Sequence, residues 1–389
     1  MATPPVSSSS SSSSLSSHHA PSGFRNPWPS KTTLSSFLHI PFTRSKASPT
    51  STPIEPVRTV PCDLRPYSDE EAENGKQEIH ATWLGHAGFL VQFAGIRILF
   101  DPIFAERASP VTWFGPKRYL PTCCQTKDLP KIDFVVISHN HYDHLDIECL
   151  KQVTLNSPEV RFLVPLRVKQ TIVDELSILE EGRVTEMDWW DVFQSKGLEF
   201  ICTPAQHNSG RGIIDQSKSL WASWVVRTAS QDTSVYFAGD TGYLGCTAFG
   251  EIGQRYGPFD LAMIPIWRGA SLSVLGRVGL RLTESATSLL ATLHATPSDA
   301  VQLFKDVRAK RAIAMHFGTF CGSEDEAKEP LELLVAELER QEISLLRERW
   351  EGQGFGYVNV GETVCVPARA ESLAPSSSTS SDISSTVLS

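Results

Sequence analysis

One heptapeptide constrains this chain more than any other feature of its sequence. Residues Ser138–His144 read SHNHYDH and directly follow the apolar run Phe134–Ile137. Such a run predicts a buried strand, so three histidines and an aspartate would lie in a tight loop at its end. Solvated histidine-rich tracts do not sit at the end of a core strand. Neutral imidazole and carboxylate groups are ligands that zinc accepts, so the heptapeptide predicts a metal site on a strand-based scaffold.

The spacing within this loop indicates more than one metal ion. His139 and His141 alternate and can point to the same side, while Asp143 and His144 turn toward a neighbouring point. Two ions need further ligands, and lone polar residues end three other apolar runs. These residues are His207, Asp240 and His316. Each alone is weak evidence, but together with the loop they are the remaining candidate ligands.

The pattern of apolar runs predicts an α/β fold. The expected strands are 79–84, 89–93, 96–100, 134–138, 161–164, 199–202, 220–226, 235–238, 261–266 and 312–316. Helical spacing is expected over 146–153, 166–179, 298–307 and 330–340. The early strands follow one another directly and the later ones alternate with helices. This order predicts two sheets packed face to face with helices outside.

Composition divides the chain into one domain and two tails. Residues 1–22 and 367–389 are rich in serine and poor in large apolar side chains, so both are expected to be disordered. Residues 23–366 are expected to form one folded domain that carries the metal site. The start of the chain lacks acidic residues before Glu55, which is compatible with a mitochondrial presequence or with a plain solvated tail.

Charge and cysteine content bear on partners and on the compartment. The formal net charge of −9 argues against a nucleic-acid partner. No run of 18 apolar residues is present, so a membrane-spanning helix is not expected. The 8 cysteines are scattered without a CxxC pair, which predicts reduced thiols and an intracellular protein. We expect a cytoplasmic protein; a mitochondrial location stays open.

These motifs resemble the metallo-β-lactamase superfamily, and within it the N-acylphosphatidylethanolamine-hydrolysing phospholipases D. The resemblance runs from Gly23 to Val366, and its combination of segments is more specific than the histidine motif alone. The matching segments include FRNPWPS (24–30), TWLGHAGFLVQF (82–93), LFDPIFAERASPVTWFGPKRY (99–119), DFVVISHNHYDHLD (133–146), TPAQH (203–207), FAGDTGY (237–243) and AMHFGTF (314–320). The resemblance implies the αβ/βα sandwich of that superfamily, with two mixed sheets flanked by helices.

The resemblance also implies roles for the candidate residues. One Zn²⁺ would be held by His139, His141 and His207, and a second by Asp143, His144 and His316. Asp240 would bridge the two ions, and a water between them would lose a proton near neutral pH and act as the nucleophile. Beyond the ligands, Asp101 is expected to orient a ligand histidine. His294 is expected to bind the substrate phosphate or to protonate the leaving group; Asp143, Asp240 and His294 are the expected catalytic residues.

The implied reaction is hydrolysis of N-acylphosphatidylethanolamine to N-acylethanolamine and phosphatidic acid. A phospholipid substrate implies contact with a membrane surface, and the resemblance alone suggests a homodimer. Two alternatives remain: hydrolysis of another phosphodiester or ester, as by a nuclease or lactonase, and an inactive lipid-binding scaffold.

The sequence departs from the family at two places. Asn208 stands where the family usually has Trp, and the segment 267–293 diverges. This segment is expected to lie near the active site. Its mixture of leucine, valine and arginine suits an anionic membrane surface.

Overall fold

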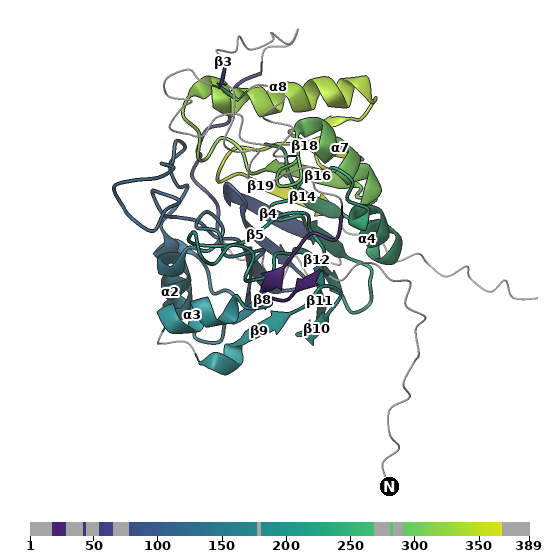
Figure 1. The fold of residues 1–389 in the computed structure, drawn as a ribbon. Helices are drawn as coiled ribbons and strands as arrows, with labels where there is room; N and C mark the ends of the chain where they lie inside the picture. The colour runs from purple at the N-terminus through teal and green to yellow at the C-terminus, as the bar shows by residue number, and fades with distance from the viewer. Residues whose placement is uncertain are drawn as a thin grey trace, which may run out of the picture.

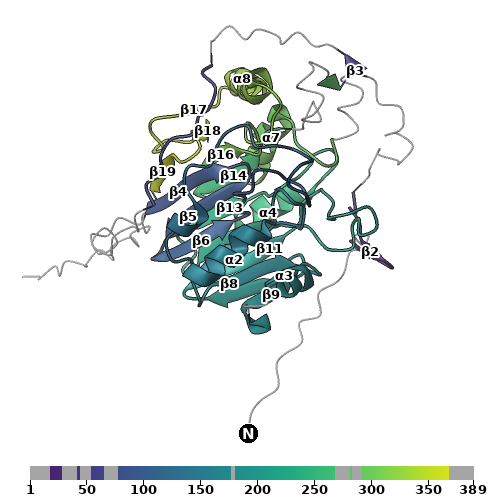
Figure 2. The ribbon, with the colours of Figure 1, turned by 90° about the vertical axis from the view of Figure 1, so that its left-hand side faces the viewer.

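Two β-sheets lie face to face in the computed structural model of the chain, and helices cover their outer faces (Figure 1, Figure 2). The structure describes residues 18–28, 42–43, 54–64, 78–176, 180–267, 281–282 and 291–367. The predicted tails, apart from residues 18–22 and Pro367, lie outside the described residues. So does most of the divergent segment 267–293. The α/β sandwich expected from the sequence is confirmed.

The larger sheet is mixed. Its strands run, from one edge to the other, in the order β10 (Val192–Ser195), β11 (Leu198–Thr203), β12 (Ser223–Thr228), β13 (Ser234–Phe237), β14 (Leu261–Pro265), β16 (Arg311–Met315), β18 (Gly354–Gly356) and β17 (Leu345–Leu346). The strands from β10 to β13 are antiparallel neighbours, and the pairs from β13 to β17 are parallel.

The second sheet is also mixed. Its order is β19 (Thr363–Pro367), β4 (Glu78–Gly85), β5 (Gly88–Phe93), β6 (Ile96–Phe100), β7 (Phe134–Val136), β8 (Arg161–Pro165) and β9 (Val184–Met187). Neighbouring strands from β19 through β6 are antiparallel, and neighbouring strands from β6 through β9 are parallel. Parallel strands buried on both faces read as continuous apolar runs, which is why Phe134–Val136 shows no alternation.

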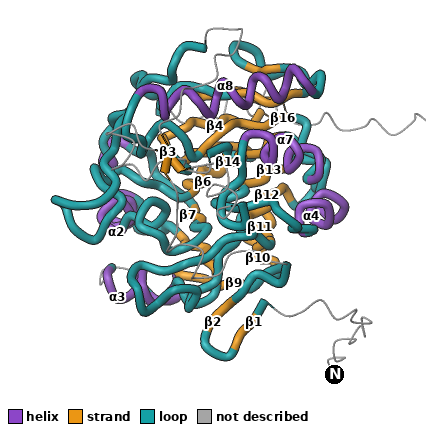
Figure 3. Tube along the Cα trace, turned by 45° about the horizontal axis from the view of Figure 1, so that its top comes forward, coloured by secondary structure: helices purple, strands orange, loops and turns teal. Residues whose placement is uncertain are grey.

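Helices cover the outer faces of both sheets (Figure 3). Helices α2 (Ile147–Asn156) and α3 (Lys169–Glu175) pack on the smaller sheet. Helices α4 (Ala248–Tyr256), α7 (Pro297–Asp306) and α8 (Glu324–Arg340) pack on the larger one. Short 3₁₀ turns lie at Thr126–Asp128 and Glu181–Arg183. Two small ribbons complete the described elements: β1 (His19–Ala20) with β2 (Gly23–Phe24), and β3 (Phe42–Thr43) with β15 (Arg281–Leu282).

Aromatic side chains from both sheets meet in the central core. The ring centroids of Phe100 and Phe237 are 4.9 Å apart, and those of Phe134 and Phe200 are 4.6 Å apart. All four side chains are fully buried. Each pair joins one sheet to the other, so the strand ends are held on a rigid scaffold.

Two boundaries differ from those expected. Residues 18–22 were assigned to the N-terminal tail, but they form part of the β1–β2 ribbon, where His18 and His19 contact the carboxylate of Asp188 at 2.6 and 2.7 Å. The last long helix begins at Glu324 rather than at Pro330, because the Ser323 side chain caps it by accepting from the Glu326 N–H. Among the described residues, no helix is long and apolar enough to cross a membrane.

Candidate metal centre

The polar residues singled out in the sequence come together where strands of both sheets end. The SHNHYDH loop follows β7, and the other candidates follow β6, β11, β13 and β16 within four residues. These neighbouring residues are Asp101, His207, Asp240 and His316. Because carboxyl ends of parallel strands meet at one edge of a sheet, the fold gathers residues that lie far apart in the chain.

Three histidines form one group of potential ligands. His139 Nε2 lies 2.7 Å from His141 Nδ1, and His207 Nε2 lies 3.3 Å from the same atom. The three nitrogens lie within 4.8 Å of one another, and His139 and His207 are buried. Three imidazole nitrogens facing one point form a donor set suited to zinc.

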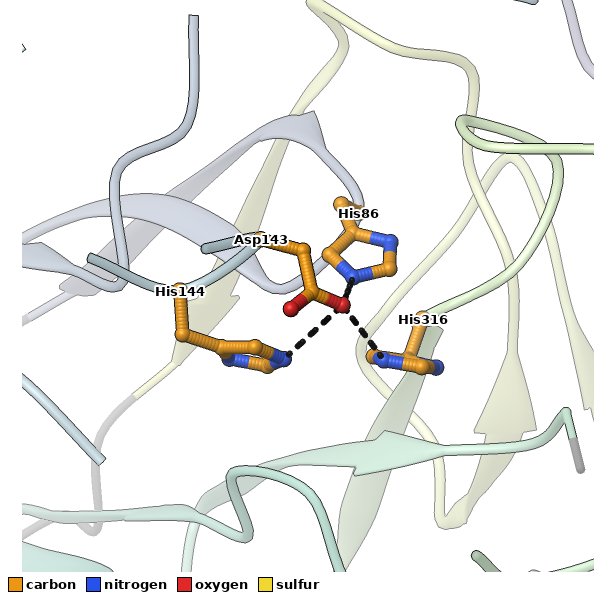
Figure 4. Close-up of side chains that lie close together, drawn as sticks. All are labelled: His86, Asp143, His144 and His316. Carbon is orange, nitrogen blue, oxygen red and sulfur yellow. Dashed lines mark hydrogen bonds and ion pairs between the residues drawn. The ribbon is translucent and has the colours of Figure 1, made fainter. Parts of the chain in front are cut away.

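A second group centres on the carboxylate of Asp143 (Figure 4). Asp143 Oδ2 lies 2.9 Å from His86 Nε2, 3.7 Å from His144 Nε2 and 3.8 Å from His316 Nε2. The four side chains come from three separate segments, and their potential ligand atoms lie within 4.8 Å of one another.

Asp240 lies between the two groups. Its Oδ2 is 3.3 Å from His144 Nε2 and 3.7 Å from His207 Nε2, and its Oδ1 is 2.9 Å from His316 Nε2. One carboxylate therefore faces nitrogens of both groups. Gly239 allows this placement: its φ is +58°, and a Cβ there would lie 2.7 Å from the Cβ of Ser138.

Outer contacts fix the orientation of several rings. The Nδ1 of His144 donates to Asp101 Oδ2 at 2.7 Å, and the Nδ1 of His207 donates to the carbonyl of Leu293 at 2.7 Å. His139 Nδ1 lies 2.8 Å from the Ser138 hydroxyl, which itself donates to Asp101. With Nδ1 engaged, the Nε2 atom of each ring points inward, which is how such hydrogen bonds orient histidines in metal sites.

Three residues of the site adopt strained backbone conformations. His86, Asp101 and His316 have φ values of +55°, +35° and +60°. Side chains with a Cβ rarely occupy this region, and each instance costs of order 1–3 kcal/mol. The surrounding contacts hold them there: His316 N–H donates to the His86 carbonyl at 2.9 Å, and His86 N–H donates to Thr319 Oγ1 at 2.6 Å. Such strain clusters at functional sites.

The charges in the site are strongly coupled. Burial, with neighbouring histidines, holds the pKa of His139 and His207 well below the usual range. Burial would raise the pKa of Asp240, but His316 and His144 outweigh it and hold that pKa well below its usual value. Burial likewise opposes charge on His144, but Asp240 and Asp143 raise its pKa well above normal. His139 and His207 are therefore neutral, as metal ligands must be.

The arrangement of potential ligand atoms fits divalent cations. His144 Nε2, His316 Nε2 and Asp240 Oδ1 are buried and form no hydrogen bond. Yet these atoms face one another at short range, with 2.9 Å between His316 Nε2 and Asp240 Oδ1. Buried polar atoms are normally hydrogen-bonded, so a converging set without such bonds is matched to cations.

Metal affinity should rise steeply with pH. Burial opposes charge on His316, but Asp240 and Asp143 outweigh it and raise the pKa of His316 to about 9. A cation must displace this proton, so apparent affinity should increase about tenfold per pH unit below that pKa for each proton released. Competition with a chromophoric chelator at pH 6.5, 7.5 and 8.5 measures this slope. A pH-independent affinity would contradict the placement of His316 among the ligands.

The structure brings the predicted site residues into one region. His294 lies beside them, with Nδ1 3.7 Å from Asp240 Oδ2 and a quarter of its side chain exposed. The sequence reasoning missed His86, which contacts Asp143. A signal for it exists: His86 follows an apolar strand and lies between Gly85 and Ala87-Gly88, much as Asp240 lies between glycines.

Comparison with known proteins agrees with the geometry. Residues 96–317 match the model of the β-lactamase superfamily domain. The N-acyl-phosphatidylethanolamine-hydrolyzing phospholipase D 1 of Caenorhabditis elegans is 35% identical over 310 residues, which are 78% of this chain and 80% of that protein. The mitochondrial enzyme of the same name from Saccharomyces cerevisiae is 33% identical over 277 residues, 69% of this chain and 54% of the yeast protein.

A solved structure shares the fold at lower identity. The isothiocyanate hydrolase from Delia radicum gut bacteria is 18% identical and has a TM-score of 0.51, covering 74% of this chain and 99% of its own. That likeness concerns the fold alone. From its sequence relatives and its domain match, the chain belongs to the metallo-β-lactamase superfamily of metal-dependent hydrolases, in the family that includes the worm N-acyl-phosphatidylethanolamine-hydrolysing phospholipase D.

Proposed function

We propose that this protein is a two-zinc phosphodiesterase that hydrolyses N-acylphosphatidylethanolamine to N-acylethanolamine and phosphatidic acid. The observation that carries the proposal is the position of Asp240 between two groups of potential ligands. The worm and yeast relatives carry this substrate and reaction type in their names, and their identity to this chain supports the same assignment here.

The proposed ligands come from the two groups, without His86. His139, His141 and His207 would hold one zinc ion, and Asp143, His144 and His316 the other, with Asp240 shared. Bound there, the ions would supply an acidified water and positive charge for the phosphate oxygens. No serine or cysteine nucleophile is needed.

The remaining residues position these groups. His86 contacts Asp143 at 2.9 Å, and burial lowers its pKa to about 3, so it donates as a neutral imidazole. On the other side of the site, the Asp101 carboxylate accepts a hydrogen bond from His144 Nδ1 at 2.7 Å. Burial also lowers the pKa of His294 to about 4, so near neutral pH this partly exposed ring would donate a hydrogen bond to a phosphate oxygen.

Product analysis tests the proposed reaction. Purified protein with quantified metal is incubated with vesicles containing N-acylphosphatidylethanolamine, with and without chelator, and the products are identified by mass spectrometry. The proposal predicts N-acylethanolamine and phosphatidic acid in equal amounts and their loss with chelator. Release of fatty acid, or of phosphorylated N-acylethanolamine, would overturn it.

A second candidate is hydrolysis of a different phosphodiester or ester. The observation that favours it is the divergent segment 267–293, whose last residue, Leu293, accepts a hydrogen bond from His207. This segment therefore reaches the site and can alter the substrate. Bound metal together with no turnover of the phospholipid, but turnover of other esters, would support this candidate.

We also propose that the protein works on a membrane surface. Ile213 and Ile214 are 95% and 85% exposed. Their loop is tied to the metal-site loop, because Gly210 N–H donates to Asn140 Oδ1 at 2.8 Å and the Arg211 guanidinium lies over the Tyr142 ring. In a second loop, Trp113 and Phe114 are 78% and 63% exposed. Exposed apolar side chains beside a site for a lipid suit insertion among acyl chains.

The double variant Ile213→Ser, Ile214→Ser should bind vesicles at least tenfold more weakly. Fully burying an isoleucine is worth about 1.5–3 kcal/mol, so even shallow insertion of two accounts for this loss. Activity on substrate dispersed in detergent should stay unchanged. Val192→Ser is the matched control, because Val192 is an apolar residue on edge strand β10 that is 51% exposed. Equal vesicle binding by the double variant and wild type would contradict the proposed surface.

A further inference from the structure

Three cysteines form a second cluster of metal-ligand atoms. Cys62, Cys123 and Cys124 bring their sulfurs within 4.8 Å of one another. All three are free thiols and are partly buried. Cys62 lies 61 residues before Cys123 in the sequence, so the fold rather than a local motif assembles the cluster.

The backbone around this cluster is fixed from three directions. The Thr59 hydroxyl donates to the Pro121 carbonyl at 2.8 Å, and Val60 N–H donates to the Val360 carbonyl at 2.8 Å. At Gly361, with φ of +95°, an added Cβ would lie 2.8 Å from the Cβ of Cys123. The thiols therefore project from segments already held together, and preorganised ligands are what a tight metal site requires.

Only one thiol of the cluster favours the thiolate before a metal binds. Contacts with the thiols of Cys123 and Cys124 hold the pKa of Cys62 below its usual range. Contact with Cys124 lowers the pKa of Cys123, but contact with Cys62 and burial outweigh it and raise that pKa. Contacts with Cys123 and Cys62 raise the pKa of Cys124. The thiolate is the form of cysteine that binds metals, and a bound cation would deprotonate the other two thiols as well.

We propose that Cys62, Cys123 and Cys124 bind a thiophilic cation such as Zn²⁺, at a site separate from the histidine–aspartate centre. With zinc–sulfur distances of about 2.3 Å, sulfurs around one ion lie about 3.8 Å apart, within the spacing observed. Three thiolates select soft cations over calcium or magnesium. The ion would cross-link the segment 54–64 to the loop that carries Cys123. Earlier in that loop, Tyr119 N–H donates to the Thr319 carbonyl at 2.7 Å, three residues beyond His316.

Cadmium titration of the full-length, reduced protein tests this site. Thiolate-to-cadmium charge transfer absorbs in the ultraviolet, and imidazole or carboxylate ligands give no such band. Wild type should develop this band and saturate it with one equivalent of cadmium bound to thiolate. The variants Cys62→Ser and Cys124→Ser should lose most of the band. Cys365→Ser, which removes an exposed cysteine beside His80, should keep it and is the matched control.

Zinc counting separates this site from the proposed catalytic one. Wild type should bind one zinc more than Cys62→Ser or Cys124→Ser, whatever number the histidine–aspartate centre holds. Circular dichroism confirms that each variant compared is folded. The proposal is overturned if the band is equal in wild type and in folded Cys62→Ser or Cys124→Ser, or if it disappears in Cys365→Ser. It is also overturned if reduced wild type gives no band, or if mass spectrometry finds these cysteines already joined in a disulfide under reducing purification.

Discussion

Asp240→Asn should lose bound metal and lower the rate of hydrolysis by a factor of about 1000 or more. Asp240 is buried, and its oxygens face nitrogens of both ligand groups. Asparagine keeps the shape but removes the negative charge and replaces one oxygen with an amide nitrogen, which is a poor metal ligand. It also removes a carboxylate that stabilises the cations of His144 and His316 in the metal-free protein.

Metal content and rate are measured on the same preparation of this variant. Asp260→Asn is the matched control, because Asp260 is also fully buried and accepts from Ser234 N–H at 3.0 Å at the start of β14. That variant should keep its metal and its rate per folded molecule. Wild-type activity in Asp240→Asn would rule out a shared ligand at this position.

Asp101→Asn should weaken metal binding by about 10–100-fold and also destabilise the fold. Asp101 is fully buried and accepts from Ser138 N–H at 2.7 Å, from the Ser138 hydroxyl, and from His144 Nδ1 at 2.7 Å. Burial raises its pKa, so these donors are what make the carboxylate tolerable there. In the variant, an amide N–H would face a donor, and each unsatisfied buried group costs about 1–3 kcal/mol.

Two measurements separate these effects. Urea unfolding of the metal-free protein gives the loss of stability, and chelator competition on the folded protein gives the loss of affinity. A variant that is merely destabilised would keep wild-type affinity and the wild-type pH slope of metal binding. That outcome would leave Asp101 a structural residue and contradict its role in orienting His144.

The candidate metal centre could be assembled from the sequence because its potential ligands follow strands that are buried on both faces. Continuous apolar runs such as Val235–Phe237 identify such strands, and the first polar residues beyond them stand out. His86 carries a similar signal, a histidine after an apolar strand and beside a glycine, but it was not among the expected ligands. That signal is weak when taken alone, and the fold gives it meaning by placing His86 beside Asp143.

Long-range pairing was the part that sequence patterns did not supply. Strand β19 forms an edge of the smaller sheet and pairs Thr363 with Thr82, which lies near the other end of the domain in the sequence. Edge strand β10 was missed because its side chains are exposed or half-buried, so burial leaves little pattern in its residues. The cysteine cluster has the same origin, since nothing in the sequence around Cys62 indicates proximity to Cys123.

Hydrolysis in ¹⁸O-labelled water tests the central claim most directly. The protein, with its metal content quantified, is incubated with vesicles of N-acylphosphatidylethanolamine, and mass spectrometry measures the ¹⁸O content of both products. Attack of water on phosphorus breaks the bond to the N-acylethanolamine oxygen, so one ¹⁸O should appear in phosphatidic acid and none in N-acylethanolamine. Label in N-acylethanolamine or in free fatty acid would contradict phosphodiester hydrolysis at this centre, as would turnover by a fully metal-free protein.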